Sequence, residues 1–185
     1  MTVIEKVKKF VFNECKKPIS KYGVEPYEFH FVPMVKYAKK LAKEHKVDQE
    51  TIEIAAWLHD IGSIIYGREN HHITSSKIAE ELLTKFEHSK DKIKVIKKSI
   101  LNHRRSIKNK RISIEEKIIA DADALCNFDM IPGLFKAAFI YEGLTQGQAK
   151  KSVREKLKDK YKMLHFKNSR AIIRPKYKAA MLLFK

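Results

Sequence analysis

His59 followed by Asp60 is the part of the sequence best suited to chemistry. The pair stands at the end of a predicted helix, in the tetrapeptide His-Asp-Ile-Gly, where Gly62 is expected to stop the helix. Side chains of adjacent helical residues point about 100° apart, so the two can reach one ion only where the helix end leaves both accessible. Imidazole nitrogen and carboxylate oxygen together suit Fe, Mn, Zn, Ni, Co or Mg. The pair therefore predicts a divalent metal site, with a simple surface pair as the alternative.

Two further segments offer ligands of the same kinds. His30 precedes an apolar helical stripe that includes Met34 and Ala38, and an ionisable group on an apolar face needs a partner. Asp121 and Asp123 stand in a helix otherwise made of Ile, Ala and Leu, where two carboxylates are costly to bury without a cation. These residues extend the predicted metal site to His30 and to one or both aspartates.

Together these residues resemble the HD-domain metal-dependent phosphohydrolases, whose signature is His, then His-Asp, then Asp, spread over several helices. The resemblance covers about residues 27 to 127. The family often has Ala-Asp-x-Leu around its last ligand, which matches Ala122 to Leu125 and favours Asp123 over Asp121. The resemblance implies an all-α fold, one or two divalent ions per chain, and attack of metal-activated water on a small phosphorylated substrate, for which a nucleotide is expected.

Two more histidines match positions that some HD subfamilies use. His71 is followed at the subfamily spacing by Ser75, Ser76 and Ala79, with His72 as the alternative register, and His103 ends an Ile-x-x-His motif. In two-metal subfamilies such histidines bind a second ion that the Asp of the pair, here Asp60, bridges; the alternative is contact with substrate phosphate. Helical phase places both histidines on the apolar faces of their helices, so we expect His71 and His103 near Asp60.

Arginines flank these histidine motifs. We expect one of Arg68, Arg104 and Arg105 to bind phosphate, the alternative being exposed loop charges, and we name His71, His103 and Arg104 as the catalytic candidates. Ser63 stands where some families have a catalytic Lys after His-Asp-Ile-Gly, which leaves an inactive metal-binding regulator as an alternative. Hydrolysis of guanosine tetraphosphate or of cyclic-di-GMP is disfavoured, because the acidic pair and the Gly-Tyr-Pro of those families are missing.

Helical periodicity runs through almost the whole chain, and long alternation of apolar and polar residues is missing. Asp48 is a predicted N-cap, residues 63 to 70 a loop, and Ser113 with Glu116 a capping box. Asn168 or Ser169 is expected to cap the last helix. The sequence therefore predicts an all-α protein with a core over residues 27 to 127 and C-terminal helices over 128 to 185.

Composition sets the remaining limits. A chain of 185 residues is about one domain. The net charge of +17 comes mainly from Lys, which favours a solvated surface and anionic substrates, with a nucleic-acid-binding module as the rival interpretation. The run Lys150 to Lys162 is expected to be an exposed helix face. No apolar run is long enough for a membrane span, the N-terminus is unlike a secretory signal, and two cysteines make no disulfide framework, so a cytoplasmic location is expected.

Overall fold

The computed structural model describes residues 1–104 and 111–184. Within this part of the chain the regular structure is helical and no strand occurs, which confirms the predicted all-α fold. Arg105, one of the arginines expected near phosphate, lies outside the described residues. The elements, in chain order, are α1 (Val3–Lys16), η1 (a π-helical turn, Tyr27–Phe31), α2 (Val32–His45), α3 (Gln49–Leu58), α4 (Ile61–Tyr66), α5 (His71–Lys85), α6 (Lys90–Asn102), α7 (Ile114–Cys126), α8 (Ile131–Lys136), η2 (π-helical, Ala137–Tyr141), α9 (Gln146–Lys162) and α10 (Lys167–Leu183).

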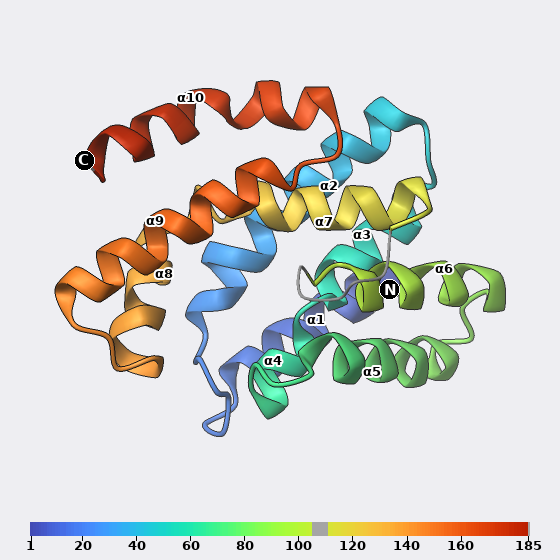
Figure 1. Ribbon diagram of the computed structural model, residues 1–185. Helices are drawn as coiled ribbons and strands as arrows, with labels where there is room; N and C mark the ends of the chain where they lie inside the picture. The colour runs from blue at the N-terminus through green and yellow to red at the C-terminus, as the bar shows by residue number, and fades with distance from the viewer. Residues whose placement is uncertain (105–110, 185) are drawn as a thin grey trace.

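The helices pack around one hydrophobic core to which α1 and α10 both contribute. Helices α5 and α6 lie side by side, α2 packs against α3 and α7, and α7 also contacts α6 and α9 (Figure 1). Helices α8, α9 and α10 lie together at the end of the molecule away from the α5–α6 pair (Figure 1). No helix of the described residues is both long and apolar enough to cross a membrane.

Apolar faces and caps explain the first helices. Val7 and Val11 of α1, and Met34 and Ala38 of α2, are completely buried, as their spacing predicts. Asp48 caps α3, because its carboxylate accepts a hydrogen bond of 2.6 Å from the backbone N–H of Thr51. This cap fixes the residue at which α3 begins.

Gly62 does not end a helix, and this prediction was wrong. Helix α3 ends earlier, at Leu58, and Gly62 lies inside the short helix α4, so the predicted loop is helical as far as Tyr66. A Cβ atom on Gly62 would lie 2.1 Å from Thr74 Oγ1 and 2.8 Å from the backbone oxygen of His71. The glycine is needed because α4 and α5 approach so closely that no side chain fits between them.

Two predicted helix starts also differ. Ser113 accepts from the backbone N–H of Glu116 at 3.2 Å, but the Glu116 carboxylate accepts from Ile112 and not from Ser113, so only half of the capping box forms. Helix α10 begins at Lys167, so Asn168 lies in its first turn and does not cap it. Neither difference changes the helix count or the packing of α7.

Candidate metal centre

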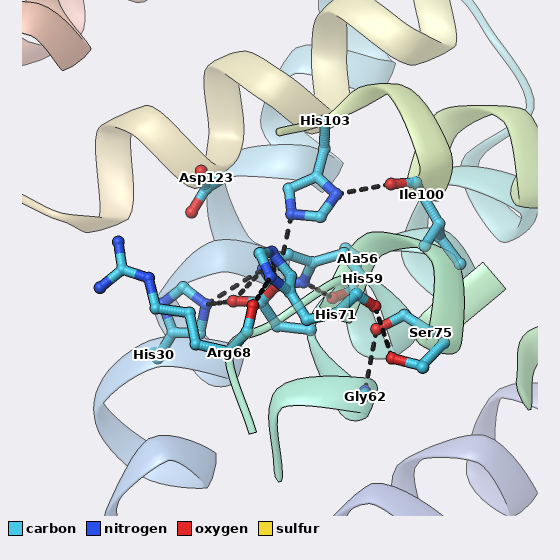
Figure 2. Close-up of polar contacts among 12 residues, drawn as sticks. His30, Ala56, His59, Gly62, Arg68, His71, Ser75, Ile100, His103 and Asp123 are labelled. Carbon is cyan, nitrogen blue, oxygen red and sulfur yellow. Dashed lines mark hydrogen bonds and ion pairs between the residues drawn. The ribbon is translucent and has the colours of Figure 1, made fainter. Parts of the chain in front are cut away.

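Asp60 lies within 4 Å of four histidines, whose side chains gather at one place in Figure 2. Its Oδ2 atom lies 3.5 Å from Nε2 of His30 and 3.7 Å from Nε2 of His59. Its Oδ1 atom lies 3.2 Å from Nε2 of His71 and 3.3 Å from Nε2 of His103. Each carboxylate oxygen therefore faces its own pair of imidazole nitrogens.

Four parts of the chain bring these five side chains together. His30 lies in the π-helical turn η1, and His59 directly follows α3. Asp60 has a non-helical backbone (φ −116°, ψ 14°) in the break between α3 and α4, which turns its side chain toward the same point as that of His59. His71 is the first residue of α5, and His103 directly follows α6. Helix ends thus supply most of the cluster, where the change of chain direction lets adjacent side chains converge.

The outer ring nitrogens of three histidines are fixed by the backbone. Each Nδ1–H donates to the carbonyl oxygen of the residue three positions earlier, an arrangement typical of histidines that bind metals through Nε2. The bonds run from His59 to Ala56 (2.8 Å), from His71 to Arg68 (2.8 Å) and from His103 to Ile100 (2.5 Å). Since Nδ1 carries the proton, Nε2 presents its lone pair to Asp60.

The protonation states of His59 and Asp60 suit metal ligation. Burial lowers the pKa of His59 to about 4, so its imidazole is neutral at pH 7. Burial alone would raise the pKa of Asp60, but the imidazoles around it, His59 first, hold that pKa well below its usual value. A neutral imidazole and an ionised carboxylate are the forms that bind a cation.

His30 differs from the other three histidines in its second nitrogen. Nδ1 lies 3.2 Å from Met130 Sδ and 3.4 Å from Cys126 Sγ, while Nε2 lies 3.0 Å from Nε2 of His59. Burial lowers the pKa of His30, but its contacts with Cys126 and Asp60 outweigh burial and raise the pKa well above 6.5. A metal ion at this position would therefore displace a proton from His30.

The donor set fits a divalent cation. His30, His59 and Asp60 offer ligand atoms within 4.8 Å of one another, and so do Asp60, His71 and His103. Among the described residues, the buried Asp60 Oδ1 has no hydrogen-bond donor, although two imidazole nitrogens face it. A buried carboxylate oxygen without a hydrogen-bond donor is unfavourable unless a cation lies beside it, so the cluster has the electrostatics of a metal centre.

The two aspartates of α7 have different surroundings. The ligand atoms of Asp123 and His30 belong to one group that also contains Cys126, and the Asp123 carboxylate forms an ion pair with Lys160 of α9. Burial raises the pKa of Asp123, but Lys160 and the nearby imidazoles outweigh burial and lower it below the usual value. Asp123 thus lies at the edge of the cluster.

Asp121 points to the opposite part of the fold. Its oxygens accept hydrogen bonds of 2.9 Å from the backbone N–H of His165, 2.8 Å from His165 Nδ1 and 3.1 Å from the backbone N–H of Phe166. Its burial is therefore explained by the connection between α9 and α10 and needs no cation. Among the described residues, Asp121 belongs to none of the groups whose atoms could share an ion, whereas Asp123 does.

His72 does not take the place of His71. It is buried beside His71, with ring centroids 5.8 Å apart, but forms no contact with Asp60, and its Nδ1 atom has no hydrogen-bond partner among the described residues. Burial lowers its pKa to about 4. The two registers are therefore distinguished in space, with His71 facing the cluster.

A cleft of about 1180 Å³ leads to the cluster. Its lining includes His30, Asp60, His71, His103 and Asp123, and the predicted arginines Arg68 and Arg104 also line it. Ser63 borders the cleft as well. The Arg68 side chain extends along the cluster toward the side where His30 and Asp123 lie (Figure 2).

Sequence reasoning missed two residues of this cleft. Lys156 and Lys160 lie in the run expected to be an exposed helix face, yet both line the cleft, and the Lys160 side chain is only 18% exposed. The two lysines are four residues apart, close to the apolar face that carries Val153 and Leu157, and this spacing could have indicated that they face inward. Lys is too frequent in this helix for the spacing to stand out.

Comparisons with known proteins agree with this geometry. A model of the HD domain matches residues 27–127, more than half of the chain. No curated protein matches the chain. Similar solved structures include the Lin1889 protein of Listeria innocua (TM-score 0.73, 20% identity, 98% of this chain and 91% of that chain) and an HD-superfamily hydrolase of Bacillus thuringiensis (0.70, 20%, 97% and 92%). Bacillus subtilis YpgQ in complex with ADP is another (0.69, 18%, 98% and 93%). The chain belongs to the HD-domain family.

Proposed function

We propose that this protein is a metal-dependent phosphohydrolase that acts on a nucleotide. The observation that carries the proposal is the position of Asp60, whose two oxygens face two separate pairs of imidazole nitrogens. A divalent ion bound there would lower the pKa of a coordinated water from 15.7 toward about 7 and would offset phosphate charge.

The ligands divide into two sets that share Asp60. His30, His59 and Asp60 would hold one ion, with Asp123 beside His30 completing the set. Asp60 with His71 and His103 would hold a second ion. A carboxylate can bridge two ions because it has two oxygens, whereas the Nδ1 atoms of His59, His71 and His103 are already bonded to the backbone, which leaves each ring one nitrogen for a metal.

The remaining groups of the cleft bind and orient the substrate. Arg68 and Arg104 present cationic side chains to the cleft, where they would bind phosphate oxygens and hold the phosphorus atom near the cluster. The same cleft is lined by Phe29, whose side chain is exposed, and by Tyr22 and Tyr141, whose rings meet edge to face at 4.9 Å. Cationic and aromatic walls in one cleft suit a nucleotide, which combines phosphate with a flat base.

The nucleotide assignment has one support outside this chain. YpgQ, which has the same fold, was solved in complex with ADP. The rival interpretation, a nucleic-acid-binding module, would use the Lys-rich surface but gives no reason for four imidazoles around one carboxylate.

Elemental analysis tests the metal assignment. We expect the purified protein to hold one or two divalent ions per chain, and His59→Ala to lose most of them while circular dichroism shows that the helices remain. His71→Gln should lower the metal content, whereas the matched variant His72→Gln should not, because only His71 faces Asp60. Unchanged metal content in His59→Ala would refute the assignment.

A hydrolysis assay tests the reaction. Release of phosphate or pyrophosphate from nucleotides should require Mg, Mn, Co, Ni or Zn and should stop when a chelator is added. Tight, strongly salt-dependent binding of DNA or RNA, with no hydrolysis under any of these metals, would replace the proposal with the nucleic-acid-binding interpretation.

A further inference from the structure

Helix α9 brings two lysines to the cleft from outside the segment that the HD-domain model matches. Lys156 and Lys160 are four residues apart and lie on one face of the helix, so they are separated by about one turn, or ~6 Å along the axis. Lys160 forms an ion pair with Asp123. Lys156 lines the same cleft and is only partly exposed, but among the described residues no carboxylate lies within ion-pair distance of it.

Two cations and two carboxylates act on the ammonium group of Lys156. Burial, together with the nearby charges of Arg68 and Lys160, lowers its pKa to about 8. The carboxylates that act against this shift are Asp123 and Glu142. Both already have partners, since Asp123 pairs with Lys160 and Glu142 lies 3.3 Å from Arg68. A partly buried ammonium beside two other cations has a free-energy cost that an anion in the cleft would remove.

The other lysines of α9 do not share these features. Lys150, Lys151 and Lys162 are exposed, and Lys158 pairs with Glu155 on its own helix. Lys156 is therefore not simply part of a solvated basic face. Along the cleft, Lys160 lies at the metal cluster, and Lys156 lies one helical turn away from Lys160.

We propose that Lys156 is a substrate-binding residue that contacts a phosphoryl group next to the one that reacts, with Arg68 on the same side. The proposal rests on the proposed phosphohydrolase function, and it names the substrate class more narrowly: a nucleotide with at least two linked phosphates. The Lys156 ammonium donates hydrogen bonds to the non-reacting phosphate and holds the reacting phosphorus at the Asp60 cluster.

Binding of two probes to the metal-loaded protein tests this role. The first probe is α,β-methylene ADP, whose phosphorus atoms are joined through carbon, and the second is AMP, which has a single phosphate. By isothermal titration calorimetry, Lys156→Gln should weaken binding of the ADP analogue on the order of tenfold and binding of AMP much less. The matched control Lys151→Gln, an exposed lysine of the same helix, should leave both affinities unchanged.

The same variants separate this inference from the function on which it rests. If the wild-type protein holds metal and hydrolyses nucleotides but Lys156→Gln binds the ADP analogue as tightly as wild type, the role of Lys156 is refuted and the function stands. Equal loss of affinity for AMP and for the ADP analogue would also refute it. If the wild-type protein holds no metal and hydrolyses no nucleotide, the function itself fails.

Discussion

The close approach of α4 and α5 at Gly62 makes this residue the most sensitive point of the metal centre outside the ligands. In Gly62→Ala the new Cβ would meet Thr74 Oγ1 at 2.1 Å, and it would meet the backbone oxygen of His71 and the backbone nitrogen of Ser75 at 2.8 Å. The threonine side chain can rotate, but the two backbone atoms belong to the first turn of α5. They can give way only if the turn that carries His71 moves.

The required movement can be worked from these distances. Ordinary contact begins near 3.4 Å, so the first turn of α5 must retreat by about 0.6 Å. Overpacking of this kind costs about 3 kcal/mol at the upper end of the usual range. For a chain of this length each kcal/mol lowers Tm by about 2–4 °C, so we expect a fall of about 6–12 °C.

The same shift reaches the metal cluster. His71 Nε2 lies 3.2 Å from Asp60 Oδ1, and metal–ligand distances tolerate only about 0.2 Å of error. The set formed by Asp60, His71 and His103 should therefore lose its ion before the set around His30 and His59. Elemental analysis should show a fall in metal per chain that is smaller than the fall in His59→Ala.

Two comparisons make the result interpretable. Gly147→Ala in α9 adds a Cβ with nothing within 4 Å, so it should raise stability by about 0.4–1 kcal/mol. Gly62→Ala combined with Thr74→Ala removes only the contact at 2.1 Å and should recover only part of the loss, because both backbone contacts stay. Thermal unfolding followed by circular dichroism measures all three. A Gly62→Ala protein that unfolds at the wild-type temperature and keeps its metal would show that the packing argument is wrong.

The remaining predictions concern α7 and α9. Asp121→Asn should lower Tm by about 6–12 °C, because a buried pair loses about 3 kcal/mol when one partner is changed. It should keep the metal content, whereas Asp123→Asn should lower the affinity for metal. The opposite pattern in elemental analysis would exchange the roles of the two aspartates. Binding of α,β-methylene ADP should weaken about tenfold between pH 7 and pH 9, because the pKa of Lys156 is about 8 and only its ammonium form binds phosphate. The charged groups that act on Lys156 are Arg68, Lys160, Asp123 and Glu142. Lys156→Arg should make the affinity independent of pH over this range, because arginine stays charged. If calorimetry shows the same decline in Lys156→Arg, another group titrates.

Local periodicity predicted the helices well because each helix must bury one apolar face. The faces of α1 and α2, the N-cap Asp48 and the inward phase of His103 all follow from spacing alone. The boundaries near Gly62 were wrong for a physical reason: glycine ends many helices, but here it serves the contact between α4 and α5, which only the tertiary structure defines.

The site could be predicted only where its residues are rare in their surroundings. An Asp inside an Ile-Ala-Leu helix is conspicuous, so both aspartates of α7 were candidates, but the sequence could not show that His165 and Phe166 satisfy Asp121 from the next helix connection. Lys156 and Lys160 could not be singled out from the sequence, because lysine is common in this part of the chain. Among so many lysines, the two that face inward have no local mark, because their role is set by the packing of α9 against α7.

The break between α3 and α4 explains how one carboxylate can serve two sets of ligands. Within a continuous helix, the side chains of His59 and Asp60 would point about 100° apart, and one of them would leave the cluster. Because α3 ends at Leu58 and Asp60 is non-helical, Oδ2 turns toward His59 and His30, while Oδ1 is left facing the ends of α5 and α6. Gly62 then keeps α5 close enough for His71 to meet Oδ1. In the tetrapeptide from His59 to Gly62, the first two residues are thus the proposed ligands, and the glycine fixes their distance to His71, the next proposed ligand.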